Sequence, residues 1–235
     1  MFTQLEPLDR ERHKSLRLGT TDMSFARDLG TVPLAPSEII PASRCYPIVF
    51  PLDSTVPNAL LSLRNTGNLF VTKDGAWRDG AYVPAHVRRY PFILADSKDG
   101  NAPVLVDRAC PALSETEGRP LFTETGEPTE MTQGVLRFLT QFRDEMTTGI
   151  ALMDKLAQAG LLVQRRLDVT FADGRKHGVD GLRTIDPEKL RDLPAETVVE
   201  WHKSGLLSLA HALLASQGNS SRLAELDARH PAQAA

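Results

Sequence analysis

The stretch that decides the fold runs from residue 129 to residue 160 and reads TEMTQGVLRFLTQFRDEMTTGIALMDKLAQAG. Its apolar residues recur at alternating intervals of four and three, with Gly149 in the one gap, and this spacing is typical of one face of an α-helix. We therefore predict a long amphipathic helix from about Thr129 to Ala159, ended by Gly160 in the left-handed conformation. The apolar face comprises Val135, Leu139, Phe142, Met146, Met153 and Leu156.

An apolar face of this length must be buried, and the sequence leaves two partners open. Packing against the chain's own sheet accounts for most amphipathic helices. The alternative is an interface with a second copy or with another protein, because the spacing is close to the heptad period of coiled coils. In that case the six residues of the face form the interface, and self-association or a protein partner is expected.

The region before the helix, from Cys45 to about Asp107, reads as short strands separated by turns. Asp74-Gly75 and the Asp-Gly-Asn at residues 99–101 adopt positive φ at little cost and so favour turns. Repeated prolines shorten the strands or place them at sheet edges. We expect a mostly antiparallel, meandering sheet whose strands lie at residues 46–50, 59–63, 68–71, 91–95 and 103–107.

The region after the helix predicts a hairpin and then a helical segment. The hairpin turns at Asp173-Gly174, and Asp186-Pro187-Glu188 is a strong helix start. Strands are expected at residues 167–171 and 179–185, helices at 187–193, 195–204 and 206–217, and a frayed, alanine-rich tail at 219–235. The predicted fold class is α+β, in a single domain that spans residues 1–218. This domain is expected to be rich in strands from about residue 20 to 125, and to consist of helices and a hairpin from residue 129 to 218.

Composition limits the partners and the compartment. The 235 residues carry a formal net charge of −3, which gives no general attraction to nucleic acid or to an anionic membrane surface. No apolar run approaches the roughly 20 residues that cross a bilayer, and charged residues interrupt the first 18 residues, unlike the apolar core of a secretory leader. We expect a cytoplasmic protein that binds no nucleic acid and is not integral to a membrane, with surface association by another route left open.

The motifs of common catalytic, cofactor and metal sites do not occur. The sequence contains no GxGxxG, no phosphate-binding loop, no HExxH and no GxSxG. Cys45 and Cys110 are too far apart for a CxxC pair, and we expect free, buried thiols. His202 and His211 would lie on opposite sides of a single helix. We predict no metal site and no cofactor, and we assign no catalytic residue.

The best candidate for a ligand site lies in residues 84–92, Pro-Ala-His-Val-Arg-Arg-Tyr-Pro-Phe, the densest mixture of cationic and aromatic groups in the chain. Its two arginines could grip a carboxylate or phosphate of a small anionic ligand with bidentate geometry. The alternative is structural: the arginines point to opposite sides of an extended segment, one paired with an acid and one in solvent. The predicted ligand-binding residues are His86, Arg88, Arg89, Tyr82 and Tyr90.

Several short motifs together resemble the bacterial SapC family. They include Tyr-Pro-Ile-Val-Phe at 46–50, Asn-Leu-Phe-Val at 68–71, Gly-Ala-Trp at 75–77 and Arg-Arg-Tyr-Pro-Phe at 88–92, and the similarity covers nearly the whole chain. The family name is associated with a paracrystalline bacterial surface layer, so the resemblance implies a role linked to the cell surface. The same name is used for a membrane-spanning permease of a peptide importer, which this chain is not expected to be.

Two functions stay open at this point. The leading hypothesis is a non-catalytic binding or assembly protein, an accessory of the bacterial cell surface, because catalytic motifs are missing and a long apolar helix face is available to a partner. The alternative is an enzyme or a small-ligand-binding protein with a pocket around His86, Arg88 and Arg89, since a pocket can be assembled from residues that are dispersed in the sequence.

Overall fold

The computed structural model describes residues 1–63, 67–95, 102–170, 174 and 176–229. Its largest sheet is antiparallel, with the strand order β10-β11-β4-β5-β3. The hairpin β10–β11 joins this sheet through β4, where Arg183 lies opposite Phe50. The strands are β3 (Thr31–Pro33), β4 (Ile48–Pro51), β5 (Asn58–Leu60), β10 (Leu162–Thr170) and β11 (Lys176–Ile185).

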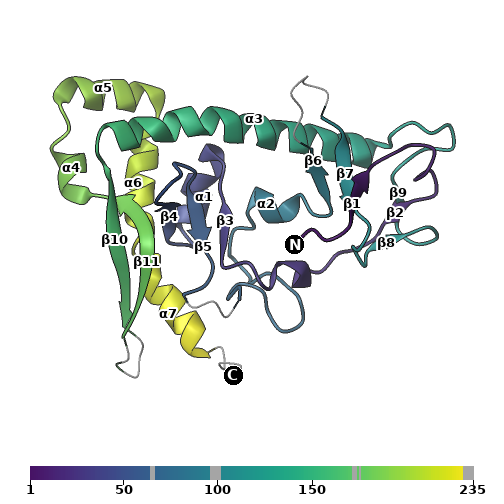
Figure 1. Cartoon of the computed structure of the whole chain (residues 1–235), viewed down its shortest axis with the longest axis horizontal. Helices are drawn as coiled ribbons and strands as arrows, with labels where there is room; N and C mark the ends of the chain where they lie inside the picture. The colour runs from purple at the N-terminus through teal and green to yellow at the C-terminus, as the bar shows by residue number, and fades with distance from the viewer. Residues whose placement is uncertain (64–66, 96–101, 171–173, 175, 230–235) are drawn as a thin grey trace.

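Two smaller sheets lie at the opposite end of the molecule (Figure 1). Their strand orders are β1-β7-β6 and β8-β2-β9, and all their pairs are antiparallel. The α+β class and the antiparallel pairing are thus confirmed, with the short strands divided among three sheets. The six strands are β1 (Leu5–Pro7), β2 (Arg17–Leu18), β6 (Phe92–Leu94), β7 (Val104–Asp107), β8 (Leu113–Ser114) and β9 (Arg119–Pro120).

One predicted strand is wrong. Residues 68–71 form no ladder, and only Val71 pairs, in an isolated bridge with Trp77. The reason is local, because the side chain of Asn68 accepts a hydrogen bond from the Phe70 N–H at 2.9 Å and bends the chain into a turn.

The long helix α3 (Glu130–Gln158) forms as predicted and runs across the molecule from the small sheets to the large one (Figure 1). The side chain of Thr129 caps its first turn by accepting a hydrogen bond from the Thr132 N–H. Its C-terminal end is followed by Gly160 at φ +71°, a conformation that costs a residue with a side chain more than it costs glycine.

The apolar face of α3 is buried by the chain itself. Met153 and Leu156 join the main core, Leu139 and Val135 pack on the β6–β7 sheet residues Phe92 and Val106, and Phe142 and Met146 pack on Ala35 and Ala85. Four of the six side chains are buried within the chain, as the packing interpretation describes, and an interface through this face stays a prediction. Val135 and Met146 are half-buried, and their role in an interface stays a prediction.

Four helices follow the β10–β11 hairpin, namely α4 (Pro187–Arg191), α5 (Ala195–Ser204), α6 (Leu206–Ser216) and α7 (Asn219–Arg229). Two of them, α6 and α7, pack against the large sheet. Fraying from residue 219 is therefore a wrong prediction as far as residue 229. Leu223 and Ala224 are buried, and the Asn219 amide donates to the carbonyl oxygens of Ser43 (2.7 Å) and Tyr46 (3.1 Å). Residues 230–235 lie outside the described part of the chain.

Short helical turns connect the sheets. They are η1 (Ser24–Ala26), η2 (Pro36–Glu38), α1 (Ile39–Ser43) and α2 (Ala85–Arg88). Cys45 and Cys110 are both free and buried, as predicted. Within the described ranges, no helix has the length and apolar content needed to traverse a bilayer.

Candidate functional site

A hollow of about 390 Å³ lies between α2, β6 and α3, and we call it the α2–α3 hollow. His86 and Arg89, at the end of α2, contribute polar groups to it, and Ile93 and Leu94 of β6 contribute apolar ones. The long wall comes from one side of α3 and consists of Leu139, Phe142, Arg143, Met146, Thr147 and Ile150. The volume of the hollow falls in the range of small-molecule sites in proteins.

A buried carboxylate fixes the position of α2. Glu38, 3% exposed, accepts hydrogen bonds from the Ala85 N–H at 2.6 Å, from the Tyr82 hydroxyl at 2.9 Å and from the Ala35 N–H at 2.9 Å. The Arg88 guanidinium lies 4.0 Å away. Three donors and a nearby cation compensate the buried charge, so Glu38 ties η2 to the start of α2.

Arg88 and Tyr82 belong to this anchor rather than to the lining of the hollow. Arg88 donates from Nε to the Val83 carbonyl oxygen (3.0 Å) and from Nη2 to the Tyr82 hydroxyl (3.2 Å), and its guanidinium stacks 5.1 Å from the Phe138 ring centroid. Burial, together with the carboxylate of Glu38, raises the pKa of Tyr82 to about 12. Both groups have their polar partners within the chain.

His86 and Arg89 form the polar pair of the hollow. Nη2 of Arg89 donates to Nδ1 of His86 at 3.0 Å, so the proton of the neutral imidazole is on Nε2. Burial, together with the adjacent Arg89 charge, lowers the pKa of His86 to about 4. His86 is therefore neutral at pH 7.

Arg89 has an unusual environment for a cation. Its guanidinium lies 5.5 Å from the Phe2 ring centroid and 5.6 Å from that of Phe142, and burial lowers its pKa to about 10. Its Nε is buried and has no hydrogen-bond partner among the described residues. No described carboxylate forms an ion pair with it, in contrast to Arg143, which pairs with Asp144 at 3.0 Å.

Tyr90 lies apart from the other predicted ligand-binding residues. Its ring stacks on Phe25, with centroids 4.0 Å apart, and contacts Phe2 at 5.6 Å. Burial raises the pKa of its hydroxyl. Tyr90 thus packs on the N-terminal segment and is not among the residues that line the α2–α3 hollow.

The predicted ligand-binding segment is therefore divided by the structure. The extended conformation considered for the two arginines is wrong, because Ala85–Arg88 is a helical turn, which places Arg88 toward Glu38 and Arg89 in the hollow. The α3 wall went unrecognised as a binding surface, although Leu139, Phe142 and Met146 were identified as an apolar face. Arg143, which follows Phe142 on α3, also lines the hollow, and no local pattern in the sequence had singled it out.

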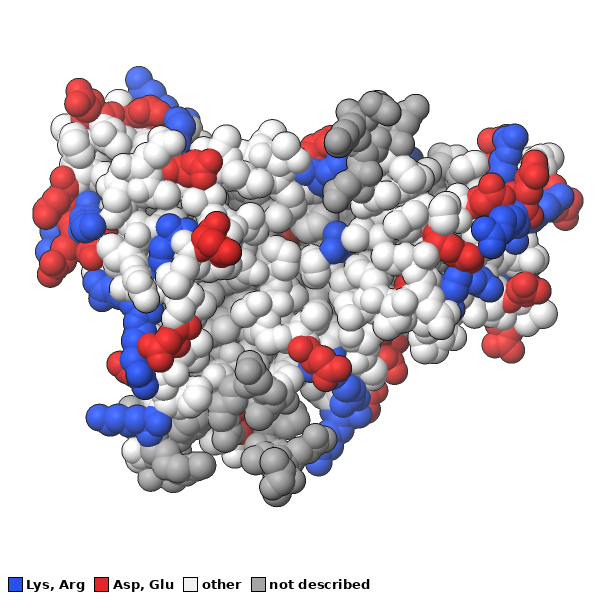
Figure 2. Space-filling view, viewed as in Figure 1, with Lys and Arg blue, Asp and Glu red and all other residues white. Residues whose placement is uncertain are grey.

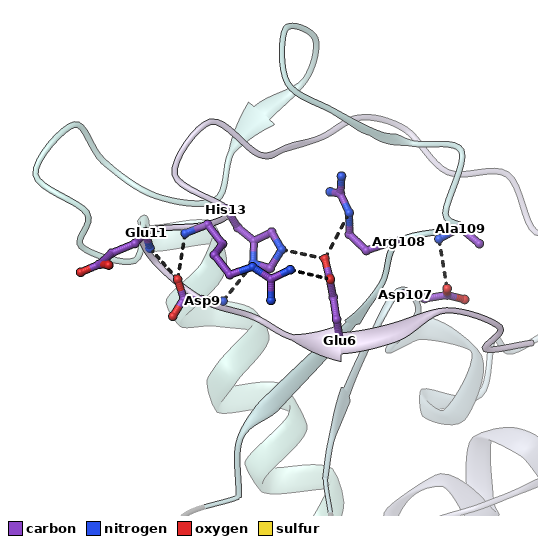
Figure 3. A network of polar contacts seen from close by, with 8 residues as sticks. Glu6, Asp9, Glu11, His13, Asp107, Arg108 and Ala109 are labelled. Carbon is purple, nitrogen blue, oxygen red and sulfur yellow. Dashed lines mark hydrogen bonds and ion pairs between the residues drawn. The ribbon is translucent and has the colours of Figure 1, made fainter.

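A second polar network joins the N-terminal segment to the end of β7 (Figure 3). Glu6 accepts a hydrogen bond from His13 Nε2 at 2.8 Å and contacts Arg12 at 3.2 Å and Arg108 at 3.3 Å. The hydrogen bond from His13 lowers the pKa of Glu6. Nδ1 of His13 accepts the Asp9 N–H at 3.0 Å, so neither ring nitrogen is available as a base. The network holds the N-terminal segment in place.

The remaining polar groups of the described ranges were compared with the requirements of a metal site. In the part of the chain that the structure describes, no group of three or more His, Cys, Asp or Glu side chains could hold one. His211 Nδ1 contacts the Leu207 carbonyl oxygen at 2.8 Å, and His202 is exposed on a different helix. On the face drawn in Figure 2, basic and acidic side chains are interspersed and gather toward the two ends.

Comparison with known proteins yields one match. The family model described as SapC matches residues 8–223, a span that includes the Glu38 anchor, the α2–α3 hollow and most of the C-terminal helices. No curated protein and no solved structure matches the chain. Since the family model covers nearly all of the described structure, the protein belongs to the SapC family.

Proposed function

We propose that this SapC-family protein is a non-catalytic binding protein that takes up a small anionic molecule in the α2–α3 hollow. The observation that carries the proposal is the Arg89 guanidinium, which is desolvated and has no ion-pair partner among the described residues. A partly buried charge without a counter-ion is less stable than one paired with an anion. An anion seated in the hollow would supply the missing counter-charge to the guanidinium.

The chemistry of the lining supports binding over catalysis. The described residues that line the hollow include no Asp, Glu, Cys, Ser or Lys, which are the usual acids, bases and nucleophiles. His86 Nδ1 is occupied by Arg89, and the low pKa of this histidine leaves Nε2 as a hydrogen-bond donor at pH 7. The same donor is suited to hold a bound anion.

The test compares three forms of the full chain by isothermal titration calorimetry with decanoate, benzoate and inorganic phosphate. In Arg89→Gln the charge is removed and donors are kept, and Arg137→Gln is the matched control, because Arg137 is an exposed arginine of α3 outside the hollow. We expect the unmodified protein and Arg137→Gln to bind at least one anion equally, and Arg89→Gln to bind it at least about 30-fold more weakly, from the 2–5 kcal/mol effect of removing one partner of a buried charge pair. Equal binding by Arg89→Gln, or binding of none of the three anions, would refute the proposal.

The cell-surface part of the proposal rests on the family resemblance. We propose that ligand capture serves an accessory role at the bacterial surface and that the protein performs it from the cytoplasmic side. Fractionation of cells that express the tagged full chain tests this. Recovery mainly from the cytoplasmic fraction is expected, and recovery mainly from the envelope or the medium would contradict the cytoplasmic location.

A further inference from the structure

Building on the proposed function, we infer that the anion is an elongated aliphatic monocarboxylate, held by its carboxylate at Arg89 with its alkyl chain along α3. The inference combines two features of the α2–α3 hollow. One is the number and kind of charges available to a ligand, and the other is the shape and polarity of the wall.

The cations of the hollow favour a ligand group that carries one negative charge on two oxygen atoms. The Arg143 guanidinium forms an ion pair with Asp144 at 3.0 Å. The Arg88 guanidinium lies 4.0 Å from the Glu38 carboxylate and does not line the hollow. His86 is held as a neutral donor by the Arg89 Nη2–H. Arg89 is then the one uncompensated cation among the described lining residues. A single guanidinium matches the fork of a carboxylate, whereas a phosphate dianion calls for a second cation or a cluster of N–H donors.

The wall favours an alkyl chain. Phe142, Met146 and Ile150 follow one another at helical spacing on α3, and the eight steps from Phe142, beside Arg89, to Ile150 span about 12 Å of helix. Ile93 and Leu94 of β6 lie on the opposite wall. An apolar strip of this length accommodates an extended chain along its axis. Its far end carries Ile150, a large apolar side chain that is 45% exposed in the structure.

The experiment measures the affinity of linear carboxylates of increasing length, from acetate through hexanoate and octanoate to decanoate, for the full chain. Each buried methylene should tighten binding about fourfold, from the transfer free energy of one CH₂. Decanol, which has the same chain without the charge, should bind at least tenfold more weakly than decanoate. Ile150→Glu should weaken decanoate binding at least tenfold and leave hexanoate binding unchanged, because only the longer chain reaches the end of the strip.

Val199→Glu is the matched control for Ile150→Glu, because Val199 is a similarly exposed apolar residue that lies on α5, outside the hollow. Affinity that rises with chain length in the unmodified protein and in Val199→Glu supports the inference. Binding of acetate, benzoate or phosphate that depends on Arg89, without a gain from added methylenes, overturns the aliphatic ligand and leaves the proposed function standing. Binding of no anion at all overturns both.

Discussion

Replacing His86 by asparagine should remove a pH dependence from the stability of the folded protein. In the structure, burial and the Arg89 charge lower the pKa of His86 to about 4, from 6.5 for an unperturbed histidine. Between these two values the unfolded chain binds a proton that the folded chain does not. The unfolding free energy is therefore unaffected by His86 above pH 6.5, and protonation of His86 in the unfolded chain lowers it as the pH falls toward 4.

The magnitude follows from the size of the shift. At 1.36 kcal/mol per pKa unit, a change from 6.5 to about 4 corresponds to about 3 kcal/mol of unfolding free energy. Asparagine keeps an acceptor for the Arg89 Nη2–H in the place of Nδ1 and cannot take up the proton. The carboxyl groups with lowered pKa, such as Glu6 and Asp107, lose their contribution only below their ordinary values of 4.5 and 3.8, so they interfere little above pH 4.5.

The assay is urea unfolding at pH 7.0, 6.0, 5.0 and 4.5, with His202→Asn as the control for an exposed histidine. The unmodified protein and the control should lose about 2 to 3 kcal/mol across this interval, and His86→Asn should lose clearly less. An equal loss in His86→Asn would refute the reasoning, because it would show that His86 takes up its proton as easily in the folded chain as in the unfolded one.

Three further predictions concern stability. A Cβ atom at Gly149 would lie 2.6 Å from the Pro36 side chain, so Gly149→Ala should lower the unfolding free energy by about 1–3 kcal/mol. The control is Gly134→Ala on the same helix, whose Cβ would meet nothing closer than 4.0 Å and which should raise the unfolding free energy by about 0.5–1 kcal/mol. Equal effects of the two variants in urea unfolding would contradict the close approach at Pro36. Glu38→Gln removes a buried charge that accepts three hydrogen bonds, and should lower stability by about 3 kcal/mol and weaken anion binding as α2 loosens; a stable variant with full binding would show that Glu38 does not position α2. Ending the chain at residue 218 removes the buried Leu223 of α7 and should lower the unfolding free energy by at least about 2 kcal/mol, whereas an unchanged thermal midpoint would indicate that α7 adds no stability.

The elements that could be predicted from the sequence are those with local signals. The apolar spacing and the cap residues Thr129 and Gly160 define α3 within one residue, and Gly205, at φ +80°, separates α5 from α6. Asp186 caps α4 by accepting hydrogen bonds from two backbone N–H groups. Each of these features depends on residues within a few positions of one another.

The features that escaped prediction depend on contacts between distant residues. The pairing of β11 with β4 joins Arg183 to Phe50, and no local pattern encodes it. The hollow is lined by residues of both α2 and α3. The position of α2 depends on its hydrogen bond to Glu38, and nothing near Glu38 in the sequence distinguishes it from the other acidic residues. The composition of residues 219–235 suggested fraying, yet the contacts of Asn219 with the Ser43 and Tyr46 carbonyl oxygens begin a packed helix.

The most direct test of anion binding at Arg89 is a ¹H–¹⁵N spectrum of the arginine Nε–H signals during titration with decanoate. Arg89→Gln assigns the signal by its loss. Because the Arg89 Nε has no acceptor among the described residues, we predict that its signal moves progressively as a carboxylate binds, while that of Arg88, which already donates to Val83, stays in place. An Arg89 signal that is unchanged at saturating decanoate, benzoate and phosphate would contradict the account.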